Sequence, residues 1–94
     1  MSKSTIKSIG LYILTYRSIN GVSQKEFAKL LGMSRQYLCC VEKGRKGISL
    51  ARVPAVAKAM GCDELFLAEL CLQEMLDKAG LGYKIYLERK KGNE

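Results

Sequence analysis

Arg35 and Gln36 carry the side chains of this sequence that are best suited to reading another molecule. Both follow Ser34, whose hydroxyl can accept a hydrogen bond from a first-turn amide, so we expect them at the start of a helix. A guanidinium group pairs with two acceptors of guanine, and a carboxamide pairs with a donor and an acceptor of adenine. These two residues therefore offer recognition of base edges in the major groove of duplex DNA.

The residues on which most enzymes depend are absent from this sequence or lack partners. The chain has no His, the commonest general base and metal ligand. It also has no phosphate-binding glycine loop and no GxSxG nucleophile. The four cysteines form no CxxC pair, and two of them are adjacent: Cys39, Cys40, Cys62 and Cys71. We therefore expect no enzyme activity, no metal or other cofactor, and reduced thiols.

Charge is divided unevenly along the chain. The 94 residues carry a net charge of +7. Residues 1–58 hold eleven Lys and Arg against two acids, whereas residues 59–82 hold one Lys against five acids. A basic half joined to an acidic segment indicates a surface for a polyanion and a separate role for the remainder. No apolar run approaches the roughly 18–20 residues that span a bilayer, so we expect a soluble, cytoplasmic protein without a membrane partner.

A short helix is expected to precede the one that Ser34 begins. Ser23 and Glu26 form a capping-box pattern that starts it at Gln24. Gly32 suits the left-handed residue that ends it. Only a short turn then separates the two helices.

The small and apolar residues of this pair meet the requirements of a helix-turn-helix motif over about residues 23–43. Ala28 is small where the helix that follows Ser34 must cross the helix that begins at Gln24, and Gly32 allows the sharp turn between them. The inward apolar positions of the motif are Phe27, Leu31, Met33, Leu38 and Val41.

Three further helices are expected around the motif. The first runs from about Ile6 to Asn20, and its apolar residues recur at helical spacing: Ile6, Ile9, Ile13, Leu14 and Tyr16. Ser49 caps the fourth, in which Pro54 predicts a later start or a distorted first turn. The fifth is capped by Asp63 and runs to Lys78, with more apolar residues than one core-facing stripe can use. The fold class is therefore all-α, with five helices.

A short strand is expected after the fifth helix, because Tyr83, Ile85 and Leu87 alternate with other residues in a period of two. We expect this strand to pair with its copy across the twofold axis of a dimer. The alternative is a tail strand that folds onto its own helices. The chain then divides into a DNA-binding domain of residues 1–80 and a dimerisation tail of residues 81–94.

From Gln24 to Val41 the sequence QKEFAKLLGMSRQYLCCV resembles the motif of the phage Cro and repressor family of helix-turn-helix regulators. The resemblance covers about residues 5–70 and includes VEKG at the end of the third helix and SLARVPAVAKAMGC in the fourth. It implies a lambda-repressor-like domain of five helices that binds double-stranded DNA. In this family the C-terminal segment commonly mediates dimerisation.

The resemblance also assigns roles to single residues. The base-reading positions fall on Arg35, Gln36 and Cys40, with Cys39 beside them. The phosphate-contacting positions fall on Gln24, Lys43, Arg45 and Lys46, and we extend them to Ser34, Tyr37 and Arg17. Arg17 and Glu42 match an ion pair that joins the first helix to the end of the third in some members. The structural positions of the motif are Ala28, Gly32, Leu38, Val41 and Glu42.

Two adjacent cysteines depart from the family pattern, and basic residues lie at both ends of the chain. A thiol is a weak hydrogen-bonding group, so we expect Cys39 and Cys40 to pack or to contact a thymine methyl group, with a redox switch as the alternative. Basic residues at the two ends of the chain are candidates for arms that wrap the duplex, or else for solvated termini: Lys3, Lys7, Arg89, Lys90 and Lys91.

The function expected from these observations is that of a dimeric repressor of phage or prophage type, which reads an inverted-repeat operator. The alternative is an antitoxin whose C-terminal half grips a toxin or another protein partner while the motif binds its own promoter.

Overall fold

The structure is a computed structural model that describes residues 8–90. Within this range the chain forms five α-helices and one 3₁₀ turn, and none of these residues forms a β-strand. The elements are α1 (Ile9–Asn20), α2 (Gln24–Leu31), α3 (Arg35–Glu42), the 3₁₀ turn η1 (Leu50–Arg52), α4 (Val53–Met60) and α5 (Glu64–Lys78). The prediction of an all-helical fold with five helices is therefore confirmed.

Three helices, α2, α3 and α5, begin at the capping residues that the sequence predicts. Ser23 and Glu26 make both hydrogen bonds of a capping box at the start of α2. Ser34 and Asp63 accept first-turn amides of α3 and α5. The first helix begins later than expected, because Ser8 caps α1 through the Leu11 amide. Its predicted first residues, including Ile6, lie outside the described range.

The fourth helix begins late, as Pro54 predicts, but Ser49 is not its cap. The hydroxyl of Ser49 makes no capping hydrogen bond, and its carbonyl instead accepts the amide of Arg52 to close the η1 turn. The α-helix proper starts at Val53, which places Pro54 in the first turn, where the missing N–H breaks no helical hydrogen bond. The cap prediction for Ser49 is therefore wrong by one turn.

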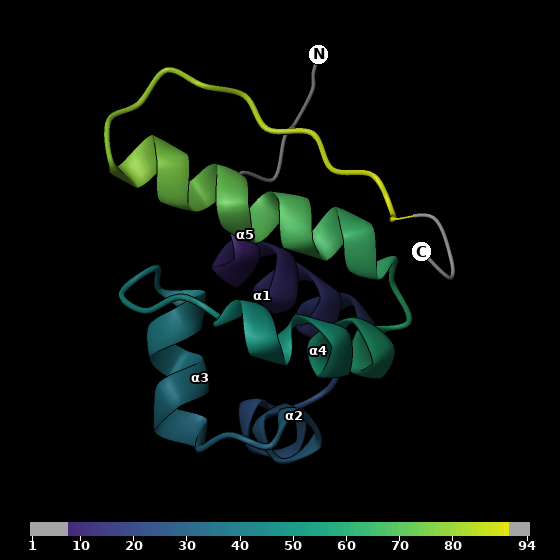
Figure 1. Cartoon of the computed structure of the whole chain (residues 1–94). Helices are drawn as coiled ribbons and strands as arrows, with labels where there is room; N and C mark the ends of the chain where they lie inside the picture. The colour runs from purple at the N-terminus through teal and green to yellow at the C-terminus, as the bar shows by residue number, and fades with distance from the viewer. Residues whose placement is uncertain (1–7, 91–94) are drawn as a thin grey trace.

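One apolar core joins all five helices. Its largest fully buried side chains include Phe27, Ile13, Leu38 and Leu67, and the inward positions Ala28, Leu31 and Val41 of the motif are buried with them. Figure 1 shows α5 lying across α1 and α4, with α2 below α4 and α3 beside it. Cys71 is buried, whereas Cys62 is half-buried. No helix within residues 8–90 is long and apolar enough to cross a bilayer.

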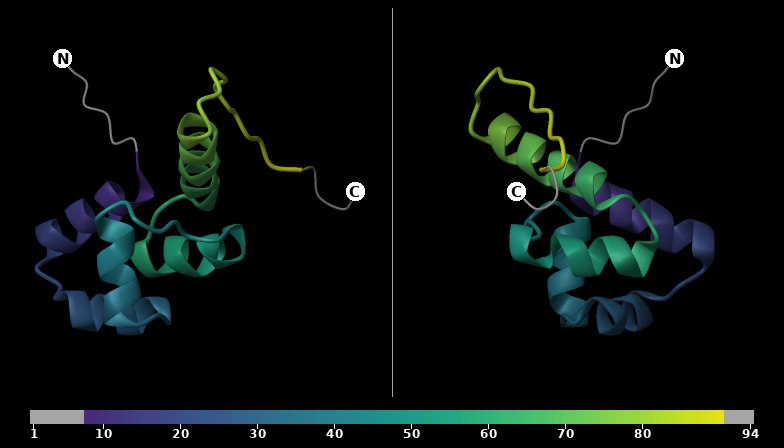
Figure 2. Two further views of the ribbon diagram at one scale, coloured as in Figure 1. Left: turned by 90° about the vertical axis from the view of Figure 1, so that its left-hand side faces the viewer. Right: turned by 45° about the vertical axis from the view of Figure 1, so that its right-hand side comes forward.

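The C-terminal segment runs back along α5 and is not a β-strand. Residues 81–90 lie on the side of α5 that faces away from α1 (Figure 2). The amides of Ile85 and Leu87 donate to the side chains of Gln73 and Glu69, at 2.9 and 2.8 Å. The alternating pattern correctly marked an extended segment, but helix side chains replace the second strand that a sheet would need. The expected strand is therefore wrong, and the segment folds onto its own helix instead.

Candidate nucleic-acid interface

The turn between α2 and α3 is fixed by backbone geometry and by one arginine from outside the motif. Gly32 has φ of 71°, a left-handed conformation that suits glycine, and its amide closes the end of α2. Arg52 of η1 reaches across and donates through Nη1 to the carbonyls of Leu31 and Gly32, both at 3.3 Å. Ala28 is 2% exposed and belongs to the apolar core.

The start of α3 presents the residues that were predicted to read bases. Arg35 and Gln36 are exposed, whereas Cys39 and Cys40 are half-buried on the same helix. A shallow hollow of about 280 Å³ lies beside this helix and is lined by Ser34, Gln36, Tyr37, Cys40 and Lys46. The structure therefore brings predicted base-contacting and phosphate-contacting residues together on one surface.

A basic loop follows α3 and folds back onto its last turn. The amides of Arg45 and Lys46 both donate to the carbonyl of Cys40, at 2.8 and 3.3 Å. Gly44 has φ of 80°, which lets the chain reverse there. Lys43, Arg45 and Lys46 are all exposed. Three cations are thus held at the C-terminal end of the helix that carries Arg35 and Gln36.

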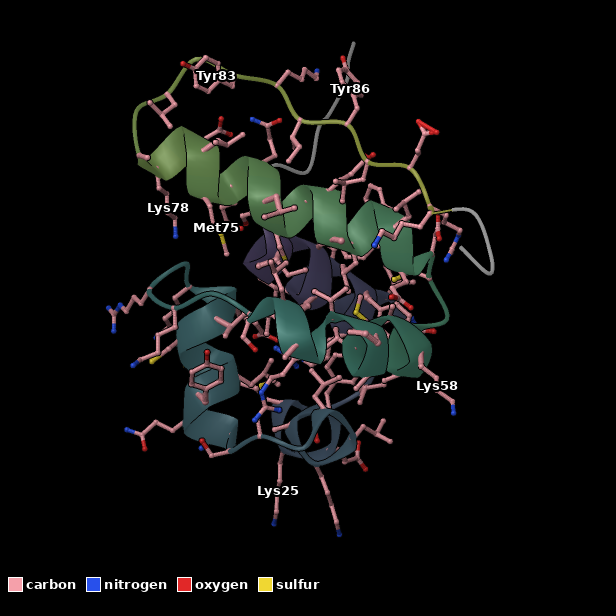
Figure 3. All side chains as sticks on the ribbon, viewed as in Figure 1. Lys25, Lys58, Met75, Lys78, Tyr83 and Tyr86 are labelled. Atoms are coloured by element: carbon pink, nitrogen blue, oxygen red, sulfur yellow. The ribbon has the colours of Figure 1, made fainter. Side chains whose placement is uncertain are left out.

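Two contacts fix the two ends of this loop. The hydroxyl of Tyr37 donates to the carbonyl of Gly47 at 2.6 Å, and Lys46 Nζ lies 5.9 Å from the centre of the Tyr37 ring. Lys78 projects from α5 toward the loop (Figure 3) and donates to the carbonyl of Gly44 at 3.4 Å. Because Tyr37 already gives its only hydroxyl proton to Gly47, it has none for a phosphate oxygen in this conformation.

Glu42 joins α1, α2 and α3 at one nearly buried carboxylate. Arg17 donates to it through Nε and Nη2, at 2.8 and 2.9 Å, and Gln24 donates through Nε2 at 3.0 Å. Arg17 also donates through Nη1 to the carbonyl of Val22. The side chains of Arg17 and Glu42 are 17% and 5% exposed. The ion pair that the family resemblance implied is present, and its hydrogen bonds raise the pKa of Arg17.

This network gives structural contacts to two residues of the predicted phosphate-contacting set. All three guanidinium nitrogens of Arg17 have partners within the protein, so its side chain serves structure. The side-chain amide of Gln24 is likewise held by Glu42. Gln24 still begins α2, whose first-turn backbone amides have no partners within the helix and suit a phosphate.

Arg89 and Cys71 lie away from this surface. Arg89 pairs with Asp63 at 3.2 Å, at the opposite end of α5 from Lys78. Lys3, Lys7 and Lys91 lie outside the described residues. Burial, with a smaller contribution from the charge of Glu74, raises the pKa of the Cys71 thiol to about 11. Among residues 8–90, no three His, Cys, Asp or Glu side chains are placed to hold a metal ion.

Three residues that position this surface do not stand out from the sequence. A Cβ on Gly10 would lie 1.9 Å from the carbonyl oxygen of Val41, so glycine allows α1 to touch the end of α3. The sign of this close approach in the sequence is a lone glycine inside a helical pattern. Arg52 and Glu74, whose carboxylate accepts the Ile9 amide at 3.0 Å, act on partners at least 20 residues away, and no local pattern marks them.

The fold and the exposed start of α3 together define a helix-turn-helix protein. The chain matches the helix-turn-helix family HTH_3 over residues 15–67, more than half of its length, and it belongs to that family. The resemblance to Cro and repressor proteins is thereby confirmed.

Similar proteins are named as regulators. An uncharacterized HTH-type transcriptional regulator of Methanocaldococcus jannaschii is 36% identical over 56 residues, which cover 57% of this chain and 85% of that protein. The control protein C.SmaI of Serratia marcescens is 33% identical over 48 residues, which cover 51% of this chain and 57% of that protein. The crystal structure of the restriction-modification controller protein C.AhdI from Aeromonas hydrophila matches with a TM-score of 0.55 and 31% identity, covering 62% of this chain and 84% of that one.

Proposed function

We propose that this protein is a transcription regulator that binds duplex DNA as a homodimer and places the start of α3 in the major groove. One observation carries the proposal: Arg35 and Gln36 are exposed at the first turn of α3, and three exposed cations flank the end of the same helix. The membership of the helix-turn-helix family and the names of its relatives support it.

Roles within this surface follow from what each group can reach. Arg35 and Gln36 contact base edges, and the half-buried Cys39 and Cys40 make van der Waals contact beside them. Lys43, Arg45, Lys46, Ser34 and the first amides of α2 contact phosphates and set the register of the helix. Two such surfaces related by a twofold axis read half-sites about 34–36 Å apart, so the operator is an inverted repeat. Covering a promoter in this way represses it.

A toxin partner is not part of this proposal. The expectation of a protein partner came from the second apolar face of α5, and residues 81–90 of the same chain lie against part of that face. Purified protein that aggregates unless a second polypeptide is added would return the antitoxin to consideration.

The experiment that tests the proposal is selection of bound duplexes from a random DNA library at two salt concentrations. Light scattering should first establish the mass of the protein in solution. We expect a single enriched inverted repeat. The alternative outcome is binding that enriches no motif and vanishes as salt rises. Such binding would rest only on attraction between basic side chains and phosphates, and would contradict sequence-specific regulation.

Arg35→Ala and Lys43→Ala should then have different effects on the selected operator. Arg35→Ala should weaken binding to this operator by about 1–3 kcal/mol and relax the preference at one base pair, because a base contact is lost. Lys43→Ala should weaken all sequences alike and reduce the salt slope by about one, because a phosphate contact is lost. Lys58→Ala is the matched control, since Lys58 is an exposed lysine on α4 away from α3 (Figure 3). Equal effects of the first two substitutions across all sequences would overturn the assigned roles.

A further inference from the structure

A row of polar side chains on α5 binds the backbone of the C-terminal segment. Gln73 receives the amide of Ile85 on Oε1 at 2.9 Å and donates Nε2 to the carbonyl of Tyr83 at 2.8 Å. Glu69 receives the amide of Leu87 at 2.8 Å. Asp63 at the N-cap of α5 pairs with Arg89 at 3.2 Å. The segment is thus held along most of the helix, running antiparallel to it. We call these α5 side chains, with the surface between them, the α5 groove.

The spacing of this row matches an extended chain. Residues four apart on a helix are displaced by about 6 Å along its axis. Residues two apart on an extended chain are displaced by about 6.6 Å. Gln73 and Glu69, four apart, therefore meet the amides of Ile85 and Leu87, two apart, without distortion of either element. The α5 groove is a site that recognises an extended peptide backbone.

Two alternate side chains of the segment, Ile85 and Leu87, face the groove, while Tyr83, which shares their register, is exposed. Ile85 and Leu87 are half-buried, and Ile85 lines a hollow with Phe66 and Leu70. Tyr83 and Tyr86 are 65% and 77% exposed and point away from α5 (Figure 3). The groove therefore selects its occupant by apolar residues at alternate positions and by a basic residue that meets Asp63.

The connection between helix and segment can change direction without loss of helical structure. The amides of Gly80 and Leu81 close the end of α5 on the carbonyls of Asp77 and Leu76. Gly82 follows this closure, is exposed, and has no atom within 4 Å of the position that a Cβ would take. Rotation at Gly82 therefore redirects residues 83–90 while α5 keeps its C-terminal cap.

We propose that in the dimer residues 83–89 of each copy occupy the α5 groove of the other copy. The inference deepens the proposed function, since it rests on the homodimer stated there. The occupant follows from the match in spacing, apolar pattern and charge between the groove and this segment. An exchange keeps every one of these contacts and closes a symmetric dimer, because each copy supplies one groove and one segment.

Exchange also brings together apolar side chains that are exposed in a single chain. Leu81 and Tyr83, at the junction between α5 and the segment, are 44% and 65% exposed when the segment docks within its own chain. Because each segment leaves its own α5 at this junction, reciprocal exchange brings the two junctions together, and burial of these apolar side chains then favours the dimer. This arrangement differs from strand pairing, because α5 side chains bind each segment.

The test uses the full chain at a concentration where light scattering shows a dimer. Uniformly ¹³C-labelled and unlabelled protein are mixed, unfolded and refolded together, and isotope-filtered NOE spectra are recorded. We expect cross-peaks between the Ile85 methyl groups of one copy and Leu70 of the other. A dimer that shows these cross-peaks only within one copy would overturn the exchange, as would a protein that stays monomeric.

A pair of proline variants provides a second readout. Leu87→Pro removes the amide that Glu69 accepts, and we expect the dimer dissociation constant to rise at least tenfold. Glu88→Pro is the matched control, because Glu88 is exposed on the alternate side of the segment, and it should change that constant less than threefold. Equal effects of the two variants would contradict docking through Leu87. Operator selection with the same samples separates the two proposals, since an inverted repeat can still be selected when the segments dock within their own chains.

Discussion

At Gly10 the backbone of α1 lies so close to that of α3 that a single methyl group does not fit. The added Cβ would stand 1.9 Å from the Val41 carbonyl oxygen, a backbone atom that cannot turn aside. Gly10→Ala should therefore lower the free energy of unfolding by about 2 kcal/mol or more, measured by urea denaturation. Gly47→Ala is the control, since a Cβ there has no neighbour within 4 Å, and it should change stability by less than about 0.5 kcal/mol. Equal stability of the two variants would show that the helices can separate at no cost.

Cys71 should make stability depend on pH in the alkaline range. Its pKa is raised from 9.0 to about 11 because burial disfavours the thiolate. Below pH 9 both the folded and the unfolded chain carry the protonated thiol. Between pH 9 and 11 the unfolded chain loses this proton while the folded protein keeps it, so the stability contribution falls as pH rises.

The size of this effect can be isolated by substitution. Two pKa units correspond to about 2–3 kcal/mol, so the wild type should lose that much more stability between pH 8 and 11 than Cys71→Ala does. Chemical denaturation of both proteins at a series of pH values measures this difference. The lysines and tyrosines titrate in both proteins, so their contributions to the pH dependence cancel. Parallel pH profiles would contradict the burial of this thiol.

At the scale of elements, the Glu42 carboxylate holds α1, α2 and α3 in one arrangement. Arg17→Met leaves this carboxylate, 5% exposed, without its charged partner, and should lower the free energy of unfolding by about 3 kcal/mol. Arg17→Met combined with Glu42→Met removes both charges and should be less destabilised than the single variant. Thermal or urea unfolding gives both values. A double variant less stable than Arg17→Met would show that Glu42 stabilises the fold without Arg17, and would contradict the cost of an unpaired carboxylate at this site.

The elements that the sequence predicts well are those whose start and end are marked locally. Capping residues at Ser23, Ser34 and Asp63 and a glycine at position 32 place α2, α3 and the start of α5 closely. The alternation at residues 83–87 predicts an extended chain but does not say what satisfies its backbone. Because Gln73 and Glu69 perform this role from a helix, only the three-dimensional arrangement could show that no second strand is needed.

The candidate interface also has a part that the sequence predicts and a part that only the structure shows. Arg35, Gln36 and the cations after α3 are exposed where the motif predicts them. Glu42 binds both Arg17 and Gln24, and a sequence gives the charges of such groups but not their distances. Arg52 and Glu74 were missed for the same reason.

At the scale of the whole molecule, a dimer links folding to concentration. A domain of this size has a thin core of its own, and association stabilises the folded state by mass action. A tenfold dilution should therefore lower the midpoint of thermal unfolding by about 5 °C, measured by circular dichroism across the range in which the dimer forms. A midpoint that does not move with concentration would contradict the homodimer.

The low exposure of the Arg17–Glu42 pair has a practical consequence for handling this protein. Mobile ions weaken exposed charge contacts such as those between the basic loop and phosphates, whereas a pair with side chains 17% and 5% exposed is screened much less. Washing at high ionic strength should thus strip co-purifying nucleic acid from the protein while the three-helix arrangement stays folded, and the eluted protein should bind operator again after desalting.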